Sequence, residues 1–302
     1  MIDHMTPPTP PVIPSATSTV GPVPTVIPGN DPIFQETHAV GKRTLWVITV
    51  VMGLSSLVFY VLATRVPVPK RLFHTLAALI TTISFITYLA LSTGDGIAYT
   101  HYRLRESHRH VPDTHRDIFR QVYWLRYVNW ALTSPLILIN LALLSGLNGA
   151  HLVVAVAADL VMFVAGAFGS FAAHDPRRWV WFTISCIAYL TVVHQMAFNG
   201  RRAATVKDVQ TRRFFGSIGG FVLVSLALYP IILATSSLAH KVTIDTEIVA
   251  FAVLDLLTQV IFSFWLLLSH DSSPQITLYV DGFWTHGIGN EGAIRVGDED
   301  RP

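Results

Sequence analysis

The sequence predicts an all-α membrane protein that forms a bundle of seven transmembrane helices. Composition is the first observation: 51% of the 302 residues are hydrophobic and 13% are charged, whereas a soluble domain carries about 25% charged residues. The mean hydropathy, +0.49, indicates the same class. The third observation is a series of apolar runs that reach the roughly 20 residues a helix needs to cross a bilayer. These observations exclude a soluble globular protein, and the net charge of +2 is too small for a nucleic-acid partner.

The N-terminal segment, residues 1–43, is rich in proline and threonine. Such a composition cannot bury enough apolar surface to fold alone, so we expect a disordered tail. It contains no apolar h-region and therefore does not resemble a signal peptide. At the other end, residues 271–302 are expected to form a C-terminal tail beyond a helical domain that spans 44–270.

The helical domain divides into seven expected spans. Neither of the first two contains a Lys, Arg, Asp or Glu, which is typical of membrane helices. The long apolar run that follows is interrupted at residues 145–149, Ser-Gly-Leu-Asn-Gly, and should split there into two spans. The expected spans are 44–64, 72–94, 120–144, 150–172, 179–198, 214–237 and 247–270.

Charge alone does not orient this bundle. An odd number of spans places the two termini on opposite sides of the membrane. The cytoplasmic side should carry the excess of Lys and Arg, but each side carries ten of them. The positive-inside rule therefore gives no orientation.

Polar residues inside the spans mark the functional candidates. One face of the third span carries four of them, within about 60° of arc at the helical period: Arg126, Asn129, Thr133 and Asn140. The seventh span adds Asp255. Such groups can hold helices together by hydrogen bonds, or they can form a proton or ligand pathway. The residue types alone leave both interpretations open.

The third span resembles the motif of the microbial (type 1) rhodopsins. Residues 126–140 read RYVNWALTSPLILIN and follow the pattern R-Y-x-D-W-x-x-T-T-P-x-x-x-x-D. Tyr229 and Pro230 fit the family's W-x-x-Y-P-x-x-W motif, and residues 255–259 fit the frame D-x-x-x-K. Residues 282–297 are similar to the tail of fungal rhodopsins. The resemblance covers about residues 40–300 and implies a seven-helix bundle of the microbial rhodopsin type, fungal branch.

Three departures from the family pattern affect the expected chemistry. The resemblance implies that a lysine at position 259 forms the Schiff base with retinal, but the residue is Gln259, which has no nucleophilic amine. The proton acceptor and donor positions carry Asn129 and Asn140, whose amides do not exchange protons near neutral pH. We therefore expect a fungal opsin-related protein that lacks the Schiff-base lysine.

The rest of the implied retinal pocket is also altered. Leu226 and Leu233 replace two tryptophans that would clamp the chromophore, and Phe182 stands at a third tryptophan position. We expect a smaller cavity than a retinal-binding relative has. The implied pocket positions are Trp130, Ser134, Asp159, Phe182, Leu226, Tyr229, Leu233 and Gln259, with Asp159 bonded to Ser134.

The remaining charges at the centre are balanced. With amides at positions 129 and 259, the centre keeps Arg126 and Asp255, one charge of each sign. A buried charge without a partner costs several kcal/mol. If Arg126 and Asp255 serve only to stabilise the fold, their side chains should meet directly or through one water.

The expected function is that of an opsin-like integral membrane protein, not an enzyme, that neither pumps nor carries a covalent retinal. It would act through unidentified protein partners in membrane or stress responses. We expect no cofactor, with noncovalent retinal included, and no metal site. The alternatives are a light-responsive retinal protein, either a photoreceptor or an ion or proton transporter, and a passive channel.

The resemblance also implies where the protein resides. Family members place the N-terminus outside and the C-terminus in the cytoplasm, and the fungal proteins of this kind are associated with the plasma membrane. The lipid bilayer is therefore an expected partner, and the sequence leaves homo-oligomerisation open.

Overall fold

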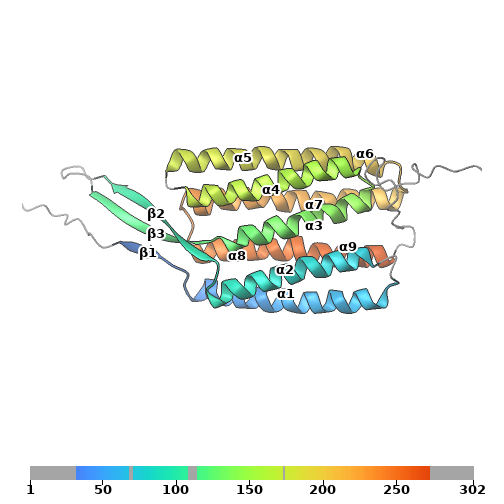
Figure 1. Cartoon of the computed structure of the whole chain (residues 1–302), viewed down its shortest axis with the longest axis horizontal. Helices are drawn as coiled ribbons and strands as arrows, with labels where there is room; N and C mark the ends of the chain where they lie inside the picture. Colours follow the sequence, from blue (N-terminus) through green and yellow to red (C-terminus); the bar gives the residue numbers. More distant parts are fainter. Residues whose placement is uncertain (1–31, 68–70, 108–113, 173, 273–302) are drawn as a thin grey trace, which may run out of the picture.

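The computed structural model describes residues 32–67, 71–107, 114–172 and 174–272. Seven helical spans run side by side along one axis (Figure 1), which confirms the predicted fold class. The spans are α1 (Ala39–Arg65), α2 (Leu72–Thr93), α3 (Leu125–Ser145), α4 (Gly149–Phe171), α5 (Asp175–Val193) continued by η2 (His194–Gly200) and α6 (Arg201–Ala204), α7 (Val209–Leu233) continued by η3 (Ala234–Leu238), and α8 (Ile244–Asp255) continued by η4 (Leu256–Ile261) and α9 (Phe262–Ser272).

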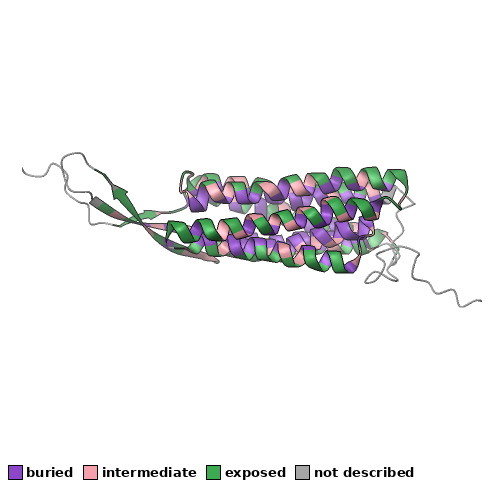
Figure 2. Cartoon of the chain, turned by 90° about the horizontal axis from the view of Figure 1, so that it is seen from above, coloured by how far each residue is buried: buried purple, intermediate pink, exposed green. Residues whose placement is uncertain are grey.

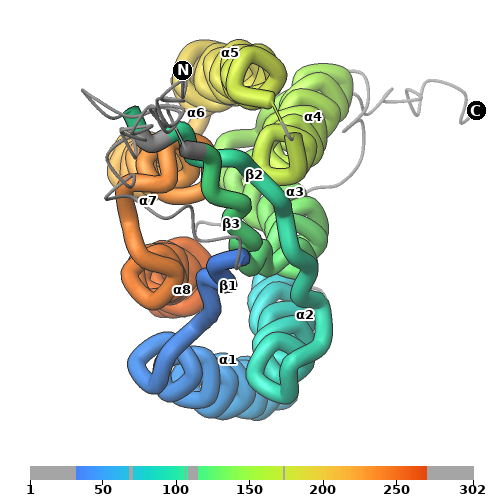
Figure 3. The backbone as a smooth tube through the Cα atoms, turned by 90° about the vertical axis from the view of Figure 1, so that its left-hand side faces the viewer, coloured from blue at the N-terminus to red at the C-terminus, as the bar shows by residue number. Residues whose placement is uncertain are grey.

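The helices form a ring in which α8 returns to pack beside α1 (Figure 3). Burial differs strongly among the spans: 67% of the apolar window of α3 is buried, against 28% for the span that begins with α5. The seventh span is 61% buried. The third and seventh spans therefore build the centre, and their polar residues face the interior of the bundle.

The outer faces of the helices are apolar. Large apolar side chains are exposed there, among them Val47 at 59%, Leu57 at 63% and Leu190 at 63%. Figure 2 shows exposed residues along the outward sides of the helices. Soluble proteins rarely expose apolar patches of this size. A lipid bilayer is the environment that such a surface requires.

Local sequence explains where several helices begin and end. Gly146 adopts a left-handed φ of +73° and ends α3, a conformation that glycine reaches without steric cost. The Asn148 side chain then accepts a hydrogen bond from Ala150 N at 2.7 Å and caps α4. The division of the long apolar run at residues 145–149 is thus confirmed.

Three spans contain a π-helical turn: η2, η3 and η4. Pro230 lies inside α7 shortly before η3 and supplies no N–H to the helix. The turn η4 contains Gln259, the position at which the resemblance places a retinal lysine. π-Helical turns often occur at functional sites.

A small sheet projects from one end of the bundle (Figure 1). It consists of β1 (Ile33–Gln35), β2 (Ile97–Glu106) and β3 (Thr114–Tyr123) in the order β1-β3-β2. β2 and β3 pair antiparallel and β1 joins β3 in parallel. Sequence reasoning treated residues 95–120 as a loop and missed this hairpin.

Because of the sheet, two observed boundaries differ from the predicted ones. β1 and the first residues of α1 fall within the segment 1–43 that was expected to be disordered, so the ordered chain reaches at least to residue 33. The third span begins at Leu125 rather than at 120, because residues 114–123 belong to β3. The other tail residues, 1–31 and 273–302, lie outside the described part of the chain.

Candidate functional site

Asp255 lies at the centre of the bundle and accepts hydrogen bonds from three side chains. Trp130 Nε1 donates to Oδ1 at 2.8 Å, and the Tyr229 hydroxyl donates to the same oxygen at 2.7 Å. The Tyr88 hydroxyl donates to Oδ2 at 2.5 Å. The residues come from four different spans, and Asp255 is fully buried. Three neutral donors suit an ionised carboxylate, which only accepts hydrogen bonds.

A second polar group lies beside Asp255 and joins the positions that the resemblance assigns to the proton acceptor, Asn129, and to the Schiff-base lysine, Gln259. The Ser84 hydroxyl contacts Asn129 Oδ1 at 3.0 Å and also contacts Gln259 Oε1. Gln259 Nε2 donates to Thr133 Oγ1 at 3.4 Å. A hydroxyl has one proton and can donate to only one of these oxygens. Turning the Asn129 amide would let its Nδ2, which has no partner among the described residues, donate to Ser84.

The structure pairs Arg126 with a different carboxylate from the expected one. Arg126 Nη1 donates to Glu247 Oε1 at 3.1 Å, and Arg120 Nη2 donates to Glu247 Oε2 at 2.9 Å. These three side chains are each at most 6% exposed. Arg126 also lies 4.7 Å from the ring centroid of Phe251, a cation–π contact. The expected meeting of Arg126 with Asp255 is therefore corrected: Glu247, in the first turn of α8, is the partner.

Sequence reasoning missed Glu247 because it is the first residue of the predicted span 247–270, and only polar residues further inside the spans were considered. The sequence did indicate its importance: Glu247 and Asp255 are separated by eight residues, or about two helical turns, and therefore lie near one face of the helix. Arg120 was assigned to a loop for a similar reason. It lies in β3, which places it over the end of the bundle.

Two further polar positions lie apart from these groups. Ser134 Oγ donates to Asp159 Oδ1 at 2.7 Å, while the other oxygen of this fully buried carboxylate has no partner among the described residues. Asn140 is fully buried, and neither atom of its amide has a partner there. At 1.5 Å per residue, Asn140 is about 21 Å along α3 from Arg126.

A small cavity lies beside Trp130 and Tyr229. Its volume is about 10 Å³, and Met162, Gly166 and Leu233 also line it. Such a volume admits about one water. Of the eight implied pocket positions, only Trp130, Tyr229 and Leu233 line it. Among the others, Leu226 is buried in the core, and Phe182 packs edge-on against Trp179.

The chain's residues can therefore be tested against retinal, the chromophore that the resemblance implies. The cavity wall beside Trp130 is mostly apolar and aromatic, which suits a polyene. The side chain of Gln259, however, ends in an amide that hydrogen-bonds Thr133 and Ser84. These residues do not fit a retinal attached by a covalent bond.

Comparison with known proteins gives the family. The family described as bacteriorhodopsin-like protein matches residues 41–273, which include all seven spans except the first two residues of α1. The chain belongs to the bacteriorhodopsin-like family.

Several relatives of this family are similar over most of the chain. Opsin-1 of Neurospora crassa is 42% identical over 282 residues, which are 93% of this chain and 92% of that protein. The light-driven proton pump LR (Mac) of Leptosphaeria maculans is 41% identical with a TM-score of 0.79, and the match covers 81% of this chain and 100% of that one. The light-driven proton pump CsR of Coccomyxa subellipsoidea is 26% identical with a TM-score of 0.71, over 78% and 100% of the two chains.

These relatives contradict two expectations drawn from the sequence. We expected a non-pumping protein of membrane or stress responses, but the similar structures include light-driven proton pumps. We also expected no cofactor, but rhodopsins use retinal as their chromophore. Both expectations rested on substitutions at a few positions, Gln259 and Asn129 above all, against a similarity that extends over the whole bundle. Pumps of this family move ions and are not enzymes, as expected for this chain.

Proposed function

We propose that this bacteriorhodopsin-like protein is a light-responsive transporter that moves protons or other ions across the membrane. The observation that carries this proposal is its 41% identity, over the whole length of that chain, to a light-driven proton pump. Retinal is the cofactor that we propose for it. The absence of an amine at Gln259 means that retinal would be held by noncovalent packing beside Trp130 and Tyr229, in a cavity that must widen to admit it. Bound there, retinal would supply the absorption of light.

The polar groups of the bundle support a transport path. Glu247 and Arg126 lie at the end that carries the sheet, Asp255 lies at the centre, and Asn140 lies about 21 Å along α3 from Arg126. The two asparagines carry no acidic group, so we propose Asp255 as the proton-transfer group of this path, while Glu247 is held as the ion-pair partner of Arg120 and Arg126. Intramembrane carboxylates in such positions commonly serve proton relays.

Proton flux into liposomes tests the proposal. The purified chain is reconstituted with all-trans-retinal and a pH-sensitive dye, and the internal pH is followed in the light and in the dark. We expect a flux that depends on light and on retinal. Asp255→Asn should reduce it roughly 100-fold, the lower range of what one positioned proton-transfer group contributes.

Asp159→Asn is the matched control, because Asp159 is an equally buried carboxylate outside the path and its Ser134 contact survives in the amide. Asp255→Asn should also fold, since the amide oxygen can still accept from Trp130 and Tyr229. A flux that is equal in light and dark would replace the pump with a passive channel. The absence of flux under both conditions would overturn the transport proposal.

We further propose that the protein lies in the plasma membrane with its N-terminus outside and its C-terminus in the cytoplasm. The bilayer is a partner of every member of this membrane family. A specific protein partner and a homo-oligomer remain predictions.

A further inference from the structure

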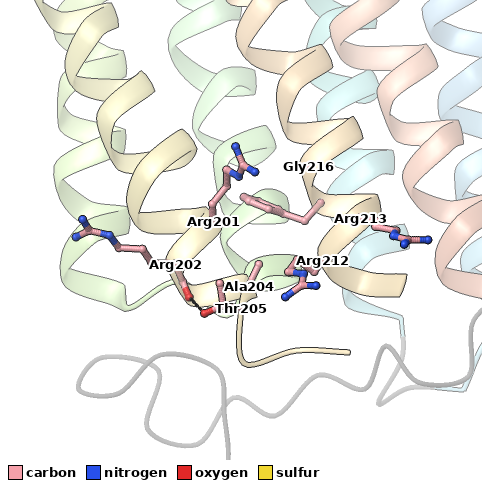
Figure 4. Close-up of a pocket in the computed structure, with 8 residues that line it drawn as sticks. Arg201, Arg202, Ala204, Thr205, Arg212, Arg213 and Gly216 are labelled. Carbon is pink, nitrogen blue, oxygen red and sulfur yellow. Dashed lines mark hydrogen bonds between the residues drawn. The ribbon is translucent and has the colours of Figure 1, made fainter. Parts of the chain in front are cut away.

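A basic cavity lies at the end of the bundle opposite the sheet. It has a volume of about 530 Å³ and is formed by α6, the following turn and the first turns of α7. Figure 4 shows Arg201 and Arg212 near its middle, with Arg202 and Arg213 directed to opposite sides. Phe215 and Thr205 complete much of the remaining wall. None of the residues of the proposed transport path lines this cavity, so it is a separate site.

Within the described part of the chain, no acidic side chain neutralises the positive charge of this cavity. All four arginines are exposed, and none forms an ion pair with another residue in the described ranges. The nearest acid along the chain, Asp208, caps α7 by accepting a hydrogen bond from Thr211 N at 2.9 Å. The hydrogen bonds from Thr211 lower the pKa of Asp208, which keeps its charge at the helix start. Arg201 and Arg212 lie near the middle of the hollow while Arg202 and Arg213 flank it (Figure 4), and guanidinium groups so placed suit a phosphate, which arginine can bind through two parallel hydrogen bonds.

The position of the cavity favours a lipid over a soluble anion. It lies where one span ends at Ala204 and the next begins at Val209. The ends of membrane-spanning helices are where the lipid headgroups of a bilayer are expected. Apolar side chains are exposed immediately beside it: Phe198 at 59%, Val206 at 83% and Val209 at 53%. A lipid places a charged phosphate directly above apolar chains, and this surface places four arginines directly beside apolar side chains.

We propose that the cavity binds the phosphate-bearing headgroup of an anionic lipid. The volume exceeds what a single phosphate needs, so a sugar-phosphate headgroup such as that of a phosphoinositide fits better than a bare phosphate. Arg201 and Arg212 hold the phosphate, and Phe198, which is exposed inside the preceding span, contacts the upper part of the acyl chains. The site neither depends on the proposed transport function nor contributes a group to it.

Native mass spectrometry of the full chain in detergent tests this site. The probe is phosphatidylinositol 4-phosphate, compared with phosphatidylcholine at the same concentration. We expect stronger retention of the phosphoinositide. Each surface arginine contributes roughly a fivefold factor to the binding of an anionic lipid. The double variant Arg201→Gln/Arg212→Gln should therefore bind the phosphoinositide about 30-fold more weakly. Arg65→Gln is the matched control, because Arg65 is the exposed last residue of α1, and α1 ends at the same end of the bundle as α6 (Figure 1).

Two outcomes would overturn the proposal. An equal loss in Arg65→Gln would show that general surface charge, not this cavity, retains the lipid. Displacement of the lipid by inorganic phosphate at equal concentration would show a site for a soluble anion. If the double variant does not fold, each single variant carries the test with its own expected fivefold loss. Lysine at both positions keeps the charge and should restore most of the binding.

Discussion

Glu247 is the residue on which the charge balance at the sheet end of the bundle depends. Its carboxylate faces the buried guanidinium groups of Arg120 and Arg126, so its loss leaves two positive charges without a partner. We expect Glu247→Gln to lower the free energy of unfolding by about 3–5 kcal/mol. Arg126→Gln should cost less, because Arg120 and Glu247 remain as a balanced pair. Unfolding of both variants in the same mixed micelles measures the difference.

Asp117→Asn is the control for that comparison. Asp117 pairs with Arg103 at 3.1 Å on the exposed side of the sheet, and an exposed pair of this kind contributes less than about 1 kcal/mol. An Arg126→Gln loss as large as that of Glu247→Gln would show that the three charges do not act as one unit.

Asn140 gives a second prediction at the level of one residue. Its amide is fully buried without a partner among the described residues, which costs about 1–3 kcal/mol for each unsatisfied group. Asn140→Leu, a change of similar size, should therefore raise the free energy of unfolding and at the same time reduce proton flux. A loss of stability would instead show that ordered water bonds the amide. Thermal unfolding and the liposome assay together decide this.

The polar residues themselves could be found from the sequence, but their partners could not. The period of 3.6 residues placed Arg126, Asn129 and Asn140 on one interior face, and the structure keeps them there. Arg126 nevertheless bonds Glu247, since side-chain partners depend on how far each helix extends, and α8 begins before the predicted span. The hydrogen bond between Tyr88 and Asp255 could not be predicted. It depends on how far α2 is shifted along the bundle axis relative to α8, and neither span alone determines that shift.

At the level of elements, the hairpin of β2 and β3 was the main feature that sequence reasoning missed. Its signal was an alternation along β3, where Ile118, Arg120 and Val122 are buried and the residues between them are less so. The many His and Arg residues of this segment obscured that period of two. From the sequence alone Arg120 is interpreted as a charged residue of a loop, because its ion pair with Glu247 is formed only in the folded protein.

The turn between η3 and α8 is a second element with a measurable consequence. His240 adopts a left-handed φ of +53°, stacks on Tyr102 with ring centroids 4.0 Å apart, and has Nε2 at 2.7 Å from Arg178 Nη1. Burial, with the nearby charges of Arg178 and Arg120, lowers the pKa of His240 from 6.5 to about 3. The imidazole therefore stays neutral and accepts the hydrogen bond from Arg178.

This depressed pKa predicts a pH dependence of stability. Below about pH 6.5 the unfolded chain binds a proton at His240, whereas the folded chain does so only near pH 3. The free energy of unfolding should therefore fall as the pH falls through this window, with the full contribution present above it. His240→Asn keeps an acceptor and tolerates the left-handed backbone, and it should flatten this slope. Unfolding midpoints of both proteins from about pH 7 to about pH 4 measure it; equal slopes would contradict the assignment.

At the level of the whole molecule, burial favours one of the two orientations that sequence counting left open. Each end of the bundle carries ten Lys and Arg residues. At the sheet end, however, Arg120 and Arg178 are only 2% exposed and are bonded within the protein. Charges that do not face lipid or water contribute little to the membrane surface interaction. The remaining count of ten against eight favours the end that carries Arg201 and Arg212 as the cytoplasmic side.

Cysteine labelling tests this orientation, because the chain has a single cysteine, Cys186, within α5. In a Cys186→Ala background, Leu104→Cys reports the sheet end and Val206→Cys reports the opposite end, at positions that are 45% and 83% exposed. A membrane-impermeant maleimide added to intact protoplasts should label Leu104→Cys at once, because the sheet end faces outward. Val206→Cys should react only after the membrane is permeabilised, since the basic end faces the anionic cytoplasmic leaflet. The reverse pattern would place the basic cavity outside the cell and would remove the electrostatic reason for this orientation.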